Sequence, residues 1–164
     1  MNEVNSASSK HRPFYETEAN RAQEREAIEQ VEFQFDSEIT QTGKGNLVDG
    51  IMKKGGIVWA YLELKCRKVE YQSQIEDEGY MISVIKWDRL RSVVRSDKPV
   101  LLVVTFGDEA YGLWIDPKQN YPTRMAGRYQ EREGRTRTEY EKMRDKEVCY
   151  FIPWKEFLPL WNMN

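Results

Sequence analysis

The chain has 164 residues, of which 40% are hydrophobic, with five Trp and nine Tyr. This length and composition predict one domain with a substantial core and exclude a wholly disordered protein. The formal net charge is only −2 and no apolar run is long enough to cross a membrane, so binding to a polyanion would need local basic patches.

The two ends of the expected domain differ in composition. Residues 1–13 are polar and Ser-rich and predict a disordered tail, without the apolar stretch of a secretory signal. Residues 14–164 are expected to form the single domain. The only histidine, His11, lies in the tail, which disfavours a histidine-based triad.

The chain has two cysteines, Cys66 and Cys149. Two are too few for a disulfide framework or a zinc site, so we expect a reducing cytoplasm, with one bridge between them left open.

The first half of the chain predicts one helix and three strands. Residues 17–31 contain strong helix formers and no Gly or Pro. Glu24 lies in line with the apolar stripe of this helix, which places a carboxylate beside the buried face. Strands are expected at 33–41, 47–53 and 57–67, and the last two are joined as a hairpin at the Gly55-Gly56 pair.

The second half predicts a further helix and strands. After a polar break at 70–79, a helix is expected from about Ser83 to Val94. The apolar run 99–106 has the length and composition of a strand covered on both faces. A strand at 109–116, and a short strand with a final helical turn within 148–161, complete the set. This order of elements predicts an α/β sandwich around a mixed sheet.

Two acids and a lysine interrupt the apolar hairpin. On its second strand, alternation places Glu63 and Lys65 on one face, with Cα atoms roughly 6.6 Å apart. Burying unpaired charges is costly, and a divalent cation between Asp49 and Glu63 would offset that cost. Lys65 would then lie beside a metal-bound water, an arrangement suited to phosphodiester cleavage. A plainer alternative has Asp49 solvated next to a turn and Glu63 and Lys65 as a half-exposed pair.

The length of the hairpin loop decides which face Asp49 occupies. A two-residue loop at Gly55-Gly56 would pair Asp49 with Leu62, on the face opposite to Glu63. A three-residue loop would pair Asp49 with Tyr61, diagonal to Glu63 and on its face. We predict the three-residue loop.

These motifs resemble the PD-(D/E)XK nuclease superfamily, whose pattern is an aspartate on one strand followed by Glu/Asp-x-Lys on the next. Asp49 in LVDGIM and Glu63-Leu64-Lys65 in YLELKCR match it, with Val48 where the pattern has Pro. The helix sequence AQEREAIEQV, residues 22–31, resembles the A-x-x-E-R-E helix of archaeal Holliday-junction resolvases. Glu24 falls at the position of the additional metal-site acid in that helix.

The resemblance implies a restriction-endonuclease-like fold, a three-layer αβα sandwich around a mixed central sheet. It also implies Mg²⁺- or Mn²⁺-dependent hydrolysis of DNA by an endonuclease or a junction- or structure-specific nuclease, with no organic cofactor. Asp49 and Glu63 would be metal ligands, together with the carbonyl of Leu64. Glu24 would hold a second ion or a metal-bound water. Lys65 would orient or deprotonate the attacking water and stabilise the transition state.

Two other functions remain open. A catalytically inactive protein on the same fold could bind DNA or a protein partner, and an unrelated α/β interaction module could carry the same acids in solvent. Charges buried at Asp49, Glu63 and Lys65 favour the enzyme, because an inactive site has no need of them. Cutting branched DNA would require a homodimer that places two sites at one branch point.

Candidate DNA contacts lie outside the hairpin. In similar sequences a lysine at the position of Lys86 faces the cleft, so Lys86 is a candidate phosphate contact, with a solvated helix residue as the alternative. The basic segment at about 117–146 is an insertion relative to the common core, with nine Lys/Arg against five Asp/Glu in 118–146. Its arginines, interleaved with tyrosines, could clamp a phosphate backbone, although a solvated face fits the same pattern. The candidates for DNA binding are Arg124, Arg128, Arg135 and Arg137.

Overall fold

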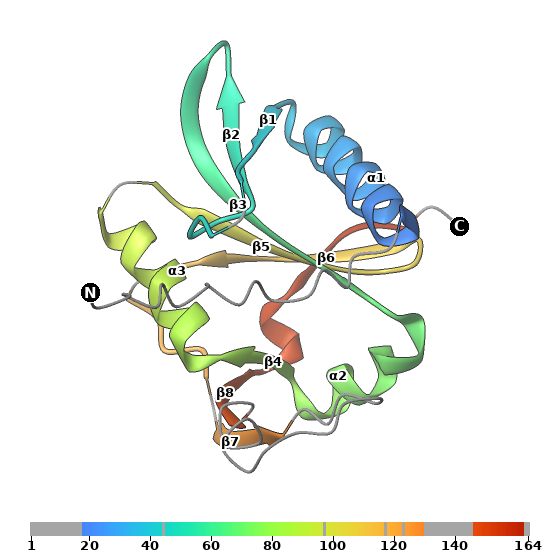
Figure 1. The fold of residues 1–164 in the computed structure, drawn as a ribbon, viewed down its shortest axis with the longest axis vertical. Helices are drawn as coiled ribbons and strands as arrows, with labels where there is room; N and C mark the ends of the chain where they lie inside the picture. Colours follow the sequence, from blue (N-terminus) through green and yellow to red (C-terminus); the bar gives the residue numbers. More distant parts are fainter. Residues whose placement is uncertain are drawn as a thin grey trace, which may run out of the picture.

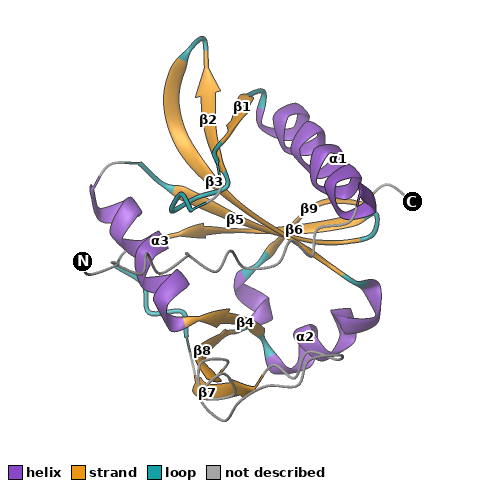
Figure 2. Cartoon of the chain, viewed as in Figure 1, coloured by secondary structure: helices purple, strands orange, loops and turns teal. Residues whose placement is uncertain are grey.

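The computed structural model describes residues 18–43, 45–96, 98–116, 118–122, 124–129 and 146–162, and Figures 1 and 2 show the course of the chain. The helices are α1 (Glu18–Phe35), α2 (Gln72–Glu78) and α3 (Val84–Ser96), with 3₁₀ turns at Val69–Tyr71 and Trp154–Glu156. The strands are β1 (Glu38–Gln41), β2 (Gly50–Lys54), β3 (Ile57–Arg67), β4 (Tyr80–Ser83), β5 (Val100–Phe106), β6 (Glu109–Ile115), β7 (Arg124–Tyr129), β8 (Lys146–Ile152) and β9 (Leu158–Asn162).

A six-stranded mixed sheet forms the middle layer, in the order β1-β2-β3-β5-β6-β9. β3 and β5 pair in parallel, and the other neighbours in this sheet are antiparallel. Every residue of β5 is buried, as its continuous apolar sequence predicts for a strand covered on both faces. The strand with the Glu-x-Lys motif, β3, therefore lies in the interior of the sheet beside β5.

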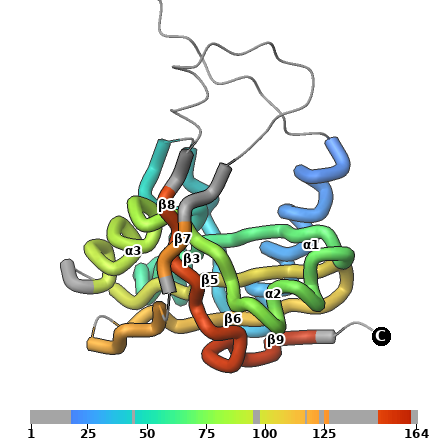
Figure 3. Tube along the Cα trace, turned by 90° about the horizontal axis from the view of Figure 1, so that it is seen from below, coloured from blue at the N-terminus to red at the C-terminus, as the bar shows by residue number. Residues whose placement is uncertain are grey.

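Each face of the sheet has its own apolar core, because alternate residues of a strand point to opposite faces. Leu101 and Val103 of β5 pack with Val31 of α1. Leu102 and Val104 pack with Trp87 of α3 and with residues of β4 and β8. Figure 1 shows α1 on one side of the sheet, with α3, α2 and a small sheet on the other. In Figure 3, which looks onto this second side, α3 and α2 flank β7 and β8.

The predicted three-layer sandwich around a mixed sheet is confirmed. One outer layer contains a feature that the sequence did not predict, a three-stranded antiparallel sheet in the order β4-β8-β7. β4 begins directly after Gly79, whose positive φ of 97° reverses the chain between α2 and the strand. An added Cβ at Gly79 would lie 2.7 Å from the Ile152 carbonyl oxygen, so β8 approaches this turn too closely for a side chain.

Several element boundaries differ from the predictions, among them the strands expected at 33–41 and 47–53, which are shorter at their N-terminal ends. α1 continues to Phe35, because Phe35 extends the apolar stripe one turn beyond Val31 and packs against the core of that face. The polar break at 70–79 contains a 3₁₀ turn and α2. The expected closing helical turn is a single 3₁₀ turn followed by β9, an edge strand that accepts Pro159.

The hairpin between β2 and β3 corrects the predicted loop length. Lys54 pairs with Ile57, so the loop is the two-residue Gly55-Gly56 turn and the three-residue prediction is wrong. A β-bulge follows, since Lys53 pairs with Val58 and Met52 with Ala60. The extra residue on β3 is Trp59, which shifts the register by one residue.

The bulge produces the placement of Asp49 that the loop was expected to produce. Beyond it, Gly50 pairs with Leu62, so the same register continued by one residue sets Asp49 opposite Glu63. Without the bulge, the two-residue turn would have set Asp49 opposite Leu62, on the other face.

Both cysteines are free thiols, Cys149 buried and Cys66 half-buried, so the open possibility of a bridge between them is not realised. No helix in the described ranges is long and apolar enough to span a membrane. The predicted tail at 1–13 lies outside the described residues, as does most of the basic segment.

Candidate active site

The ammonium group of Lys65 joins the two acids of the hairpin. Its Nζ atom lies 2.6 Å from Oε1 of Glu63 and 3.4 Å from Oδ2 of Asp49. The two carboxylates thus share one cation, although they come from different segments of the chain. The structure brings Asp49, Glu63 and Lys65 together where β2 begins beside β3.

Glu63 is a fully buried charge, with 0% of its surface exposed. Its second oxygen, Oε2, lies 2.7 Å from Nζ of Lys86 on α3. A carboxylate without partners would be strongly destabilising at this depth, and two ammonium groups compensate it. The structure therefore places Lys86, a candidate phosphate contact, against the central acid of the motif.

Asp49 is fastened to β3 through both its backbone and its side chain. Its N–H donates to the Leu62 carbonyl, and its Oδ2 accepts from the Leu64 N–H, both at 2.9 Å. The side chain thus takes the place of a strand partner just before β2 begins at Gly50. The N–H and C=O of one strand residue point to the same side, so the Leu64 carbonyl also points toward the side of Asp49.

The loop that carries Asp49 is held from two directions. The backbone N–H of Thr42 donates to the Asp49 carbonyl at 2.9 Å, and the Thr42 hydroxyl donates to the Val48 carbonyl. From the other direction, Nζ of Lys86 donates to the Leu47 carbonyl at 2.9 Å. α3 is therefore linked through one side chain both to this loop and to Glu63. Sequence reasoning missed the contact with Leu47, because a backbone carbonyl leaves no sequence signal.

Glu24 approaches Asp49 from the α1 side of the sheet. The two acids line one cavity of about 190 Å³. The other lining residues are Ile28, Gln41, Thr42, Leu62 and Leu64. Glu63 alternates with Leu62 and Leu64 and contacts α3 on the opposite face. Among the described residues, no three His, Cys, Asp or Glu side chains gather closely enough to hold an ion, so an ion shared by Glu24, Asp49 and Glu63 stays a prediction.

Lys65 is held in its charged form. Burial alone would lower the pKa of Lys65, but the negative charges of Glu63 and Asp49 and a hydrogen bond to Glu63 outweigh it and raise that pKa above its ordinary value. With both carboxylates charged, Lys65 can therefore position a water or stabilise negative charge, but it is a poor proton acceptor.

The sequence also missed Tyr80, which lies near this cluster on β4. Its hydroxyl accepts a hydrogen bond from Nη2 of Arg67 at 3.1 Å, and the Arg67 guanidinium lies over the ring at 5.7 Å from its centroid. Burial raises the pKa of Tyr80, so the phenol stays neutral beside Glu63 and Lys65. Tyr80 was missed because β4 was not predicted.

Two of the four predicted arginines lie on the small sheet. Arg124 and Arg128 are on β7, the outer strand of the small sheet. Arg135 and Arg137 lie outside the described residues. Their roles in DNA binding stay predictions.

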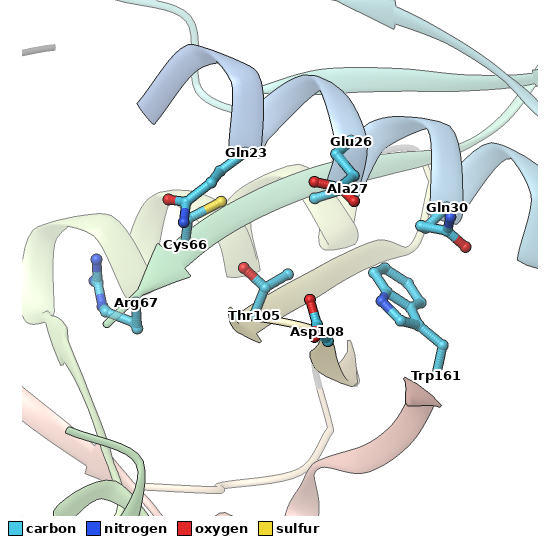
Figure 4. Close-up of a pocket in the computed structure, with 10 residues that line it drawn as sticks. Gln23, Glu26, Ala27, Gln30, Cys66, Arg67, Thr105, Asp108 and Trp161 are labelled. Atoms are coloured by element: carbon cyan, nitrogen blue, oxygen red, sulfur yellow. The ribbon is translucent and has the colours of Figure 1, made fainter. Parts of the chain in front are cut away.

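A second cavity, of about 90 Å³, opens between α1 and the ends of β3 and β5 (Figure 4). Its lining is mostly polar and contains none of the predicted site residues: Gln23, Glu26, Ala27, Gln30, Cys66, Arg67, Thr105, Gly107, Asp108 and Trp161. It has no cluster of charges comparable to the one around Glu63.

The donor set around Asp49 and Glu63 fits a hard divalent cation. Both Glu63 oxygens are buried, one 2.6 Å from the Lys65 ammonium group and the other 2.7 Å from that of Lys86, so this position already binds positive charge. Asp49 contacts the same Lys65 ammonium group, and the Leu64 carbonyl points toward the side of Asp49, so both are further oxygen donors of the kind that Mg²⁺ and Mn²⁺ prefer.

Comparison with protein families identifies the chain. Residues 10–160 match the family described as “Phage putative PDDEXK endonuclease”. The chain belongs to this family. No match is found among curated proteins or among solved structures. The region matched to the PDDEXK family contains α1 and the hairpin with Asp49, Glu63 and Lys65, so the resemblance to the PD-(D/E)XK superfamily is confirmed. The further likeness of residues 22–31 to archaeal resolvases stays a prediction.

Proposed function

We propose that this PDDEXK protein is an endonuclease that hydrolyses phosphodiester bonds of DNA with Mg²⁺ or Mn²⁺. The contact of one ammonium group, Lys65, with both Asp49 and the buried Glu63 carries the proposal. An ion pair with a purely structural role needs only one acid beside Lys65. A second acid, from another segment and beside a fully buried carboxylate, supports a cation-binding site.

Each residue has a role in this proposal. Asp49, Glu63 and the Leu64 carbonyl would hold the cation, which when bound polarises the phosphate and acidifies a water. Lys65 keeps its proton, orients that water and stabilises the negative charge that develops on the phosphate oxygens. Glu24, which shares a cavity with Asp49, would hold a second ion or a water.

DNA would reach the site across the α3 and small-sheet side. Lys86 is a candidate for a phosphate contact at the site, and the basic segment would add contacts to the DNA backbone through Arg124, Arg128, Arg135 and Arg137. The family description supports action on DNA during phage growth, for which the cytoplasm is the expected compartment. Branched substrates would require a homodimer.

A cleavage panel tests the proposal. Purified protein is incubated with linear, nicked, single-stranded and four-way DNA in the presence of Mg²⁺, Mn²⁺, Ca²⁺ or EDTA. We expect cleavage of at least one substrate with Mg²⁺ or Mn²⁺ and none with EDTA. Absence of cleavage of every substrate with both metals, with DNA binding that still weakens as salt rises, would favour the inactive DNA-binding alternative.

A further inference from the structure

We infer that Lys86 is a positioning residue that competes with the divalent cation for Glu63, so that metal binding releases its ammonium group toward DNA. The inference rests on the proposed metal-dependent function. It arises from one unusual feature, which is that two lysines from different elements hold the two oxygens of a single buried carboxylate.

The charges of the cluster are already balanced without a metal. Asp49 and Glu63 contribute two negative charges, and Lys65 and Lys86 contribute two positive ones. A divalent cation bound to Glu63 would lie beside both ammonium groups, at a position with little water to screen the repulsion. One of the two ammonium groups must therefore move away when the cation binds.

Of the two ammonium groups, that of Lys86 loses less interaction energy when it moves away from Glu63. The second partner of Lys65 is another carboxylate, Asp49, and Lys65 is tethered to the same strand as Glu63. The second partner of Lys86 is a neutral carbonyl, that of Leu47. Leaving a neutral carbonyl costs less free energy than leaving a second carboxylate, whose negative charge also attracts the ammonium group.

The same contact gives Lys86 a role before the metal arrives. By reaching both Glu63 and the Leu47 carbonyl, it fixes the loop of Asp49 relative to β3. The metal-free protein thus keeps its ligands in place without a cation. Once displaced, the Lys86 ammonium remains at the edge of the site, where its side chain is 26% exposed and can reach a phosphate.

The matched variant is Lys86→Gln, which keeps a hydrogen-bond donor on a slightly shorter side chain but carries no charge. Mn²⁺ binding to the full chain is measured by isothermal titration calorimetry without DNA. We expect Lys86→Gln to bind Mn²⁺ on the order of tenfold more tightly than the wild type, because no ammonium has to be displaced. The control is Lys68→Gln, which removes an exposed ion pair with Glu70 at 3.7 Å and should leave Mn²⁺ affinity unchanged.

A double-mutant cycle of thermal unfolding in EDTA distinguishes a specific effect of Lys86→Gln on Glu63 from general misfolding of the variant. Lys86→Gln should lower the Tm of the wild type but have a much smaller effect in a Glu63→Gln background, since its charged partner is gone. Equal effects in both backgrounds, or Mn²⁺ affinity in Lys86→Gln that is unchanged or weaker, would overturn the inference while leaving the nuclease proposal intact. Failure of the wild type to bind Mn²⁺ would instead overturn the proposed function, and the inference with it.

Discussion

The carboxylate of Asp49 accepts a hydrogen bond from the backbone N–H of Leu64 at 2.9 Å. Leu64 is the middle residue of the Glu63-Leu64-Lys65 triplet, so its backbone holds the Asp49 side chain next to the triplet. The position of Asp49 therefore does not depend only on its contact with the flexible side chain of Lys65.

This contact predicts that Asp49→Asn and Asp49→Ala differ in stability but not in activity. The asparagine oxygen can still accept from Leu64, whereas alanine leaves that N–H without a partner, so we expect Asp49→Ala to be less stable by about 1 kcal/mol. Both variants should lose metal-dependent cleavage, because both lack the charge. Urea denaturation and a plasmid-nicking assay measure the two effects, and equal stability of the variants would show that the hydrogen bond contributes nothing.

Glu63→Gln is expected to reduce DNA cleavage by at least about 100-fold, because it removes a charged ligand from the proposed cation site. DNA binding measured in Ca²⁺ should persist, since Glu63 is buried and cannot contact DNA. Glu70→Gln serves as the control, because Glu70 is exposed and lies outside the site. Cleavage by Glu63→Gln at the wild-type rate would exclude Glu63 as a metal ligand.

Two glycines with positive φ give a matched pair for stability. Gly79→Ala would place a Cβ 2.7 Å from the Ile152 carbonyl oxygen, whereas a Cβ at Gly55 would meet nothing within 4 Å. At Gly55, with a φ of 54°, the substitution carries a left-handed backbone penalty of about 1–2 kcal/mol. At Gly79, with φ 97° and ψ 163°, the backbone lies in a region essentially restricted to glycine, which costs an Ala about 1–3 kcal/mol, and Gly79→Ala also adds a clash that must push β8 away from the turn. We expect Gly79→Ala to lower the free energy of unfolding by clearly more than Gly55→Ala, as measured by urea titration. A similar loss in both would contradict the close approach of β8.

The basic segment is tested through the salt dependence of DNA binding. Replacing Arg124 or Arg128 with Gln in the Glu63→Gln background should each reduce the slope of log K against log salt by about 1, if each arginine neutralises one phosphate. Fluorescence anisotropy with a labelled duplex at several NaCl concentrations gives the slopes. Unchanged slopes would support the alternative that this segment is a solvated face.

Much of this architecture could be predicted from local sequence. The apolar run of β5 predicts a central strand, and alternation along β3 predicts that Glu63 and Lys65 share a face, because both depend only on the period of the strand. In the outer layer a strand was expected at the position of β8, but β4, β7 and the pairing of the three strands into a small sheet were not. β4 is short, and its partner β8 is distant in sequence, so their pairing depends on tertiary contacts rather than on local propensity.

The placement of Asp49 shows most clearly where prediction from the sequence fails. Glycine pairs predict a tight turn, but nothing local predicts a bulge at Trp59, which packs in the core with Phe35 and Trp114. The predicted three-residue loop was therefore wrong, although the bulge gives Asp49 the orientation that this loop was expected to give. The contacts of Lys86 lay equally beyond prediction, since they depend on how α3 is oriented over the sheet.

The bulge at Trp59 divides the hairpin into two parts with different tolerance to change. Beyond it, residues 53–58 form an outer tip, and lengthening that tip by equal numbers on both strands leaves the orientation of Asp49 unaltered. Removing the single extra residue would turn the aspartate to the far side of the sheet. The tip is thus a suitable place to insert a fluorescent label or an affinity sequence. The bulge at Trp59 lies between the insertion and the site, so the orientation of Asp49 would not change.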